Sequence, residues 1–100
     1  MKVRYTPRAI ADIEDNHAYI ADRNPQASVA VVARIKQAIE GLGDFPGMGR
    51  MTERGNVRVL PVGRYPYLIF NEIDAAGDEI VIVHVRHGAR RRPGSLIGKG

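Results

Sequence analysis

The sequence contains two helix-start signals in close succession, and they constrain the fold more than any other feature. Each is a capping residue followed by a proline, first Thr6-Pro7 and then Asn24-Pro25. A Thr or Asn side chain caps the free N–H groups of a first helical turn, and proline suits the first helical position because it lacks an N–H. We expect the first helix to reach about Asp22, which leaves a very short connection before the second. The sequence therefore predicts a tight helical hairpin.

Apolar residues recur in both predicted helices at steps of three and four, the spacing of one helical face. In the first helix this face is predicted to contain Ile10, Ile13, His17 and Ile20. His17 is then expected at the edge of the core, held by a hydrogen bond. The second helix is expected to end at Gly41 and Gly43, because glycine takes the left-handed C-terminal conformation easily. Its buried stripe is predicted at Val31, Val32, Ile35, Ala38, Ile39 and Leu42.

The second half of the chain changes to strand periodicity. A strand is predicted at 57–62, where Pro61 indicates an edge position or a bulge, and further strands are predicted at 67–73 and 79–86. Residues 74–78 are expected to form a turn in which Gly77 takes a positive φ. The segment 80–83 is apolar on both faces, which is typical of a central strand covered on both sides.

A short extended segment at 2–5 and a long loop at 43–56 complete the predicted order, which is β-α-α-β-β-β. The fold class is α+β, with the helical hairpin packed on one face of a small, mainly antiparallel sheet. The opposite face carries alternating large side chains, so it is expected to be concave or covered by something else.

Length and composition predict a single domain over residues 1–100, with a flexible tail at about 93–100. The absence of cysteine excludes disulfides and thiolate metal sites, and it suits a reducing compartment. No apolar segment typical of a secretory signal or a membrane span is visible. A cytoplasmic protein is therefore expected.

The positive charge of the chain is unevenly distributed. Residues 1–49 hold six basic and six acidic residues, whereas residues 50–100 hold nine basic and five acidic ones, so the whole net charge of +4 belongs to the second half. Such asymmetry predicts an acidic or polyanionic partner, and the alternative is charge that serves only solubility.

Six short motifs, in order, resemble the RelE/ParE toxin superfamily over roughly residues 3–92. They begin with Tyr5-Thr6-Pro7-Arg8-Ala9 leading into Asp12-Ile13, and end with His87-Gly88-Ala89-Arg90. Between these lie Tyr19-Ile20-Ala21, Asn24-Pro25, Phe45-Pro46-Gly47-Met48-Gly49-Arg50 and Tyr65-Pro66-Tyr67-Leu68-Ile69. The Pro-Gly-x-Gly-Arg loop and the His-Gly-Ala-Arg ending look more like the ParE branch.

The resemblance implies the toxin of a type II toxin–antitoxin system, neutralised by a cognate, ParD-like ribbon-helix-helix antitoxin in a hetero-oligomer. Operator DNA would then be contacted only through the antitoxin, and no membrane is involved. The ParE branch is associated with poisoning DNA gyrase, which is the function expected here. The alternatives are a RelE-like endonuclease that cuts mRNA on the ribosome, and a non-toxic member that only binds antitoxin and co-represses the operon.

Arginines and a histidine of the second half are the candidates for contact with the target, since guanidinium pairs with phosphate or carboxylate in a bidentate fashion. They are Arg58, Arg64, Arg86, His87, Arg90, Arg91 and Arg92. In the RelE-like alternative the catalytic residues would be Arg58, Arg86, His87 and Arg90, and His84 or His87 could shuttle a proton. However, no Tyr or Phe follows Phe70 and no Lys lies between Lys36 and Lys99, whereas the RelE pattern includes a terminal aromatic residue and a lysine cluster.

Aromatic residues are the candidates for contact with the antitoxin, namely Tyr19, Tyr65, Tyr67 and Phe70. For Tyr65 and Tyr67, ordinary half-buried strand tyrosines are the alternative, and for the run 90–92 it is a solvated tail. The three histidines lack zinc-site spacing, so neither a metal nor another cofactor is expected.

Overall fold

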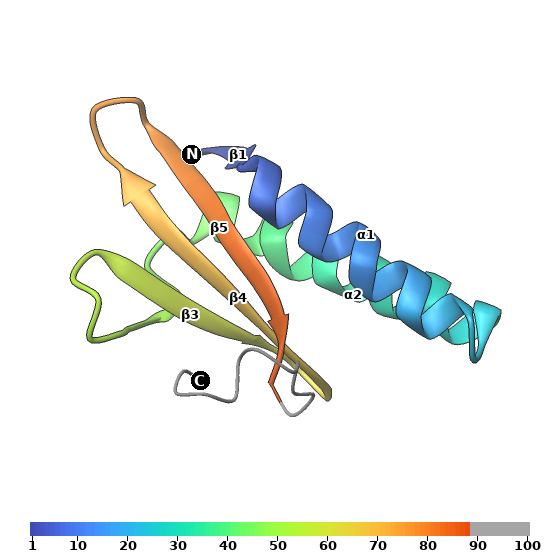
Figure 1. Cartoon of the computed structure of the whole chain (residues 1–100). Coiled ribbons are helices and arrows are strands. Elements are labelled where there is room, and N and C mark those ends of the chain that lie inside the picture. Colours follow the sequence, from blue (N-terminus) through green and yellow to red (C-terminus); the bar gives the residue numbers. More distant parts are fainter. Residues whose placement is uncertain (89–100) are drawn as a thin grey trace.

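The structure, a computed structural model, describes residues 1–88 and places two helices against one face of a five-stranded sheet (Figure 1). This confirms the predicted α+β class. The expected tail at about 93–100 and the arginines at 90–92 lie outside the described residues. In chain order the elements are β1 (Lys2–Tyr5), α1 (Pro7–Ala21), α2 (Pro25–Asp44), β2 (Arg50–Met51), β3 (Val57–Val62), β4 (Tyr65–Asp74) and β5 (Glu79–His87).

Both helices begin where the capping signals predict. The Thr6 hydroxyl accepts a hydrogen bond from the Ala9 N–H at 3.0 Å, and the Asn24 side chain accepts one from the Ala27 N–H at 3.1 Å. The connection between the helices is tight, because the Asn24 N–H already donates to the Ile20 carbonyl at 2.7 Å. The two helices therefore run side by side as an antiparallel hairpin (Figure 1).

The prediction of the buried face of α1 was correct only in part, because Ile13 and Ile20 are partly buried against the core but Ile10 and His17 are not. The residues that α1 buries are Ala9, Asp12 and Asn16, whereas Ile10 is 47% exposed and His17 is exposed. Polar side chains can be buried when hydrogen bonds satisfy them. Asp12 meets donors from β5, and the Asn16 amide donates to the Asp12 carbonyl at 2.8 Å. Because of these bonds, the side of α1 that carries Ala9, Asp12 and Asn16 faces the protein interior. His17 lies on another side of the helix and is not a residue of the core edge.

The stripe predicted for α2 is confirmed, but its end was misplaced. Val31, Ile35, Ile39 and Leu42 are all buried. The helix continues through both glycines to Asp44. At Gly43 a Cβ would lie 3.1 Å from the Met1 carbonyl oxygen and 3.3 Å from a methyl group of Val3. This glycine therefore serves the close approach of α2 to β1 and does not end the helix.

The strands are ordered β1-β5-β4-β3-β2, with β1 parallel to β5 and the other neighbours antiparallel. β5 is an interior strand, as its apolar run predicts. The predicted bulge at Pro61 is confirmed, because the β3–β4 register shifts between Pro61 and Val62. β3 is not an edge strand, however, since the two-residue β2 pairs with it inside the expected loop.

The turn between β4 and β5 also differs from the prediction. Asp78 takes the positive φ, at 54°, whereas Gly77 does not. The Asp74 side chain accepts a hydrogen bond from the Gly77 N–H at 3.2 Å, which stabilises the conformation of residues 74–77. Aspartate tolerates the left-handed region better than most side chains, which lets Asp78 close the turn.

The hydrophobic core lies between the hairpin and the sheet. Ile35, Ile39 and Leu42 of α2 pack there with buried residues of β4 and β5, among them Ile69, Ile80, Ile82 and Val85. Side chains alternate along a strand, so their neighbours point to the opposite side of the sheet. We call this opposite side, turned away from the helices, the outer face.

Candidate binding site on the outer face of the sheet

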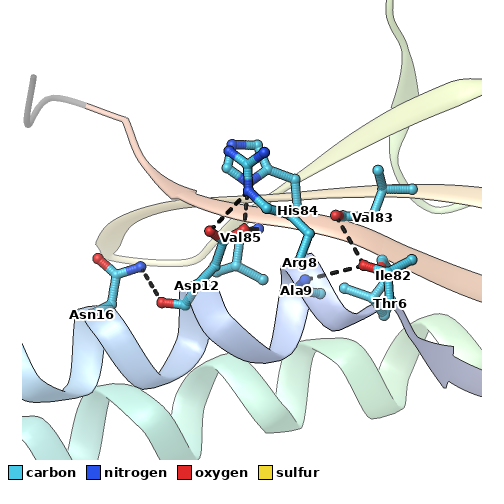
Figure 2. A network of polar contacts seen from close by, with 9 residues as sticks. All are labelled: Thr6, Arg8, Ala9, Asp12, Asn16, Ile82, Val83, His84 and Val85. Atoms are coloured by element: carbon cyan, nitrogen blue, oxygen red, sulfur yellow. Dashed lines mark hydrogen bonds and ion pairs between the residues drawn. The ribbon is translucent and has the colours of Figure 1, made fainter. Parts of the chain in front are cut away.

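The carboxylate of Asp12 joins α1 to β5 and is the centre of a polar network (Figure 2). One oxygen, Oδ2, accepts the backbone N–H of Val85 at 3.0 Å and contacts Nδ1 of His84. The other, Oδ1, accepts the Nε–H of Arg8 at 3.3 Å. Asp12 is buried, so these donors replace the water that an exposed carboxylate would bind.

The network forms where β5 loses its strand partner. β1 pairs with β5 only as far as Tyr5 opposite Ile82, and α1 begins directly afterwards. The Thr6 N–H donates to the Ile82 carbonyl at 3.1 Å, and the Thr6 hydroxyl lies 2.9 Å from the same oxygen. Asp12 then accepts the Val85 N–H, which would otherwise be a free donor at the sheet edge. The first turns of α1 thus complete the hydrogen bonding of the β5 edge.

A bulge in β5 brings His84 into this network. Phe70 of β4 is opposite His84, and Asn71 is opposite Ile82, so Val83 has no partner across the β4–β5 ladder. An extra residue of this kind bends a strand and redirects its side chains. His84 can therefore contact α1 through Nδ1 while its ring stacks on Phe70, with centroids 5.6 Å apart and an interplanar angle of 25°.

A cation completes this group on the outer face. The guanidinium carbon of Arg86 lies 5.2 Å from the centroid of the Phe70 ring. Arg86 is exposed, while Phe70 and His84 are half-buried. The site thus combines a fixed pair of rings with an arginine at the solvent boundary, an arrangement suited to bind an anion or a flat aromatic group.

The structure separates the residues predicted to contact the target. Arg58 donates to the Gly49 carbonyl at 3.0 Å and so holds the loop before β2. His87 packs edge-on against Tyr67 on the helix side of the sheet, with ring centroids 5.0 Å apart. Arg86 lies on the outer face and Arg64 is exposed in the β3–β4 turn. The predicted Arg90, Arg91 and Arg92 lie beyond the described residues.

The residues predicted to contact the antitoxin are not gathered on one surface either. Tyr19 is 42% exposed on α1, where the guanidinium of Arg23 lies 3.9 Å from its ring centroid. Tyr65 lines a groove beside α2, while Phe70 lies on the outer face. Tyr67 is only 3% exposed and belongs to the core.

Sequence reasoning named His84 and Arg86 as candidates but gave Asp12 and Arg8 no role beyond their place in a family motif. A usable signal was present, because Ala9, Asp12 and Asn16 recur at steps of three and four on one helical stripe.

Among residues 1–88, no group of three His, Cys, Asp or Glu side chains could hold a metal ion. Neither α1 nor α2, the helices of that part of the chain, is long and apolar enough to cross a membrane.

The fold is similar to that of solved bacterial toxins. A chain of the chromosomal ParDE toxin–antitoxin system from P. aeruginosa matches with a TM-score of 0.77 at 24% identity, over 87% of this chain and 95% of that one. The isolated E. coli RelE toxin matches with a TM-score of 0.68 at 9% identity, over 95% and 92%. The architecture is therefore that of the RelE/ParE toxins.

Sequence comparison identifies the family. Residues 3–92 match the ParE toxin of the type II toxin–antitoxin system parDE. The chain is 31% identical over 83 residues to putative toxin Y4kP of Sinorhizobium fredii, covering 83% of this chain and 86% of that protein. It is 34% identical over 89 residues to toxin RelE2 of Caulobacter vibrioides, covering 89% and 97%. The chain belongs to the ParE toxin family of type II toxin–antitoxin systems, which confirms the resemblance in its motifs.

Proposed function

We propose that this protein inhibits growth by binding DNA gyrase and holding it in a state that leaves DNA broken. The observation that carries the proposal is the match of residues 3–92, almost the whole chain, to the ParE toxin. The Pro-Gly-x-Gly-Arg loop and the His-Gly-Ala-Arg ending support the same branch. The toxin acts as a binding protein and performs no chemistry of its own.

The positions of the arginines support a mechanism without catalysis. Cleavage of RNA requires an acid, a base and cations that converge on one phosphate. Arg58 is engaged with loop carbonyls, His87 lies on the helix side, and Arg86 lies on the outer face. The candidates for a RelE-like site thus do not share one face, since Arg86 is separated by the sheet from Arg58 and His87, and Arg90 is beyond the described residues.

We further propose that a ParD-like antitoxin neutralises the toxin by covering the helical hairpin. Solved relatives include a ParDE system and the E. coli RelBE toxin–antitoxin complex. Exposed apolar side chains on the hairpin offer such a surface, with Ile10 47%, Tyr19 42% and Val29 67% exposed. An amphipathic antitoxin segment would bury them. The product is a cytoplasmic hetero-oligomer that meets operator DNA only through its antitoxin.

The runner-up is a RelE-like endonuclease, and one observation favours it. Asp12 orients His84 through Nδ1, which is how a carboxylate positions a histidine for proton transfer. The 34% identity to a toxin named RelE2 is consistent with this alternative. It would need phosphate-binding groups around His84.

Two assays with the purified chain test these functions. The proposal predicts inhibition of DNA supercoiling by gyrase and intact mRNA on programmed ribosomes. Codon-specific cuts in that mRNA, with gyrase unaffected, would replace the proposal by the endonuclease. Inactivity in both assays, together with tight antitoxin binding, would identify a non-toxic member that only co-represses its operon.

A further inference from the structure

A row of cross-strand partners runs across the outer face from β2 to β5. Arg50 is opposite Val59, Val59 is opposite Phe70, and Phe70 is opposite His84. Directly opposed residues lie on the same face of a sheet. Strands are spaced about 4.8 Å apart, so the row is roughly 14 Å long. We call Arg50, Val59, Phe70 and His84, together with the adjoining Arg86, the basic row.

Charge is unevenly distributed on the outer face. Asp74 and Glu79 lie at the β4–β5 turn, where Arg4 pairs with Glu79 at 2.9 Å. Two further acids lie nearer the basic residues: Glu72 is two positions from Phe70 on the same face of β4, and Glu53 lines a groove with Arg50. The basic row lies toward the other end. In the part of the chain that the structure describes, no carboxylate lies within ion-pair distance of Arg50 or Arg86. An anion would therefore meet two exposed guanidinium groups at this end and be repelled from the other.

The rings of the basic row are held in place before any ligand arrives. Asp12 contacts His84, and Phe70 stacks on His84 and lies close to Arg86. A side chain that is already fixed loses little conformational entropy on binding. The Phe70–His84 pair is thus fixed in advance, and another flat ring would stack on a face of the pair that neither the partner ring nor Arg86 covers.

We propose that the basic row binds single-stranded DNA. One base stacks on the Phe70–His84 pair, and the flanking phosphates pair with Arg50 and Arg86. Duplex DNA fits poorly, because the faces of its bases are already stacked. An RNA of the same sequence is the comparison, because Glu72, two residues from Phe70 on the same face of β4, could accept a hydrogen bond from a 2′-hydroxyl. This contact goes beyond gyrase binding and does not depend on it.

The test uses the full chain and a short oligothymidylate that contains one 2-aminopurine, a base whose fluorescence falls when it stacks. Binding is followed by anisotropy at several salt concentrations, and stacking by quenching. With two phosphates neutralised, the logarithm of the association constant should fall with log[salt] with a slope of about −1.4, because single strands contribute about −0.7 per phosphate.

Variants separate the two parts of the proposal. Phe70→Leu should weaken binding about tenfold and remove the quenching, while Phe70→Tyr should restore both. Arg86→Gln, at an exposed position, should reduce the salt slope by about 0.7. Arg23→Gln makes the same charge change in the connection between α1 and α2 and should alter neither quantity. Circular dichroism and thermal melting confirm that each variant is folded.

Three results would overturn the proposal. They are quenching that persists in Phe70→Leu, a salt slope that Arg86→Gln does not change, and duplex DNA or an RNA of the same sequence that binds at least tenfold more tightly. None depends on gyrase, so a failed supercoiling assay leaves the DNA-binding result interpretable, and the reverse also holds.

Discussion

The buried carboxylate of Asp12 accepts the backbone N–H of Val85 at 3.0 Å, and this bond closes the edge of β5 where β1 has ended (Figure 2). A side chain of α1 here supplies the hydrogen-bond acceptor that a neighbouring strand would otherwise provide. The same carboxylate fixes His84, so the stability of the fold and the arrangement of the outer face depend on one residue.

Replacing Asp12 by alanine should therefore be strongly destabilising. The buried Val85 N–H would lose its acceptor and the half-buried His84 ring would lose its partner, which lowers the free energy of unfolding by about 3 kcal/mol. Asp12→Asn keeps one acceptor oxygen, so its free energy of unfolding should lie between those of the wild type and Asp12→Ala. Asp15→Asn, an exposed aspartate on the same helix, is the matched control. Urea denaturation that gives Asp12→Ala the stability of the control would contradict this account.

The two helix caps should differ in their contributions. Asn24→Ala removes one cap and should lower the free energy of unfolding by about 1 kcal/mol. The Thr6 hydroxyl also bonds to the carbonyls of β5, at 2.9 Å for Ile82 and 3.2 Å for Val83. Thr6→Ala should consequently be more destabilising, by about 2 kcal/mol in all. Equal values from chemical denaturation would show that the Thr6 hydroxyl acts only as a cap.

Alkaline pH should weaken the fold partly through Tyr5. Burial, and to a smaller extent the Glu40 carboxylate, raises the pKa of the Tyr5 hydroxyl above its ordinary value of 10.0. Between the ordinary and the raised pKa, the unfolded chain releases this proton while the folded chain retains it, so stability falls as pH rises. Tyr5→Phe should lose less stability than the wild type between pH 8 and pH 11. Identical losses in urea titrations would exclude this contribution.

Asn71 should be replaceable without loss of stability. It is fully buried on β4, and within residues 1–88 its Oδ1 has no hydrogen-bond donor. Its amide donates a hydrogen bond to the nearby Ile69 carbonyl, at 3.0 Å. Asn71→Val removes the unpaired oxygen and suits a strand, so the free energy of unfolding should rise by about 1 kcal/mol. A fall of that size would indicate that Oδ1 has a partner, such as a buried water molecule.

The elements of the fold were largely predictable, because their signals are local. The caps at Thr6 and Asn24, the apolar stripe of α2 and the unbroken apolar run of β5 depend on neighbours a few positions away. The errors arose where distant contacts prevail over local preference. Gly43 lies within α2 and allows the close approach of β1, and the pairing with β3 creates β2 within a loop.

The candidate site was less predictable for the same reason. Asp12 and His84 are 72 positions apart, and only the parallel pairing of β1 with β5 and a bulge at Val83 bring them together. The arginines of the second half were all candidates for contact with the target. The pleat of the strands places Arg58 and Arg86 on opposite faces, because alternate residues point in opposite directions.

Gyrase-mediated DNA cleavage tests the central claim most directly. Supercoiled plasmid, gyrase and ATP are mixed with increasing toxin, and the enzyme is then denatured and digested so that trapped breaks appear as linear DNA. The account predicts linear DNA that increases with toxin and disappears when the cognate antitoxin is added first. Plasmid that remains unbroken at toxin concentrations well above that of gyrase, while mRNA on ribosomes is cut, would contradict it.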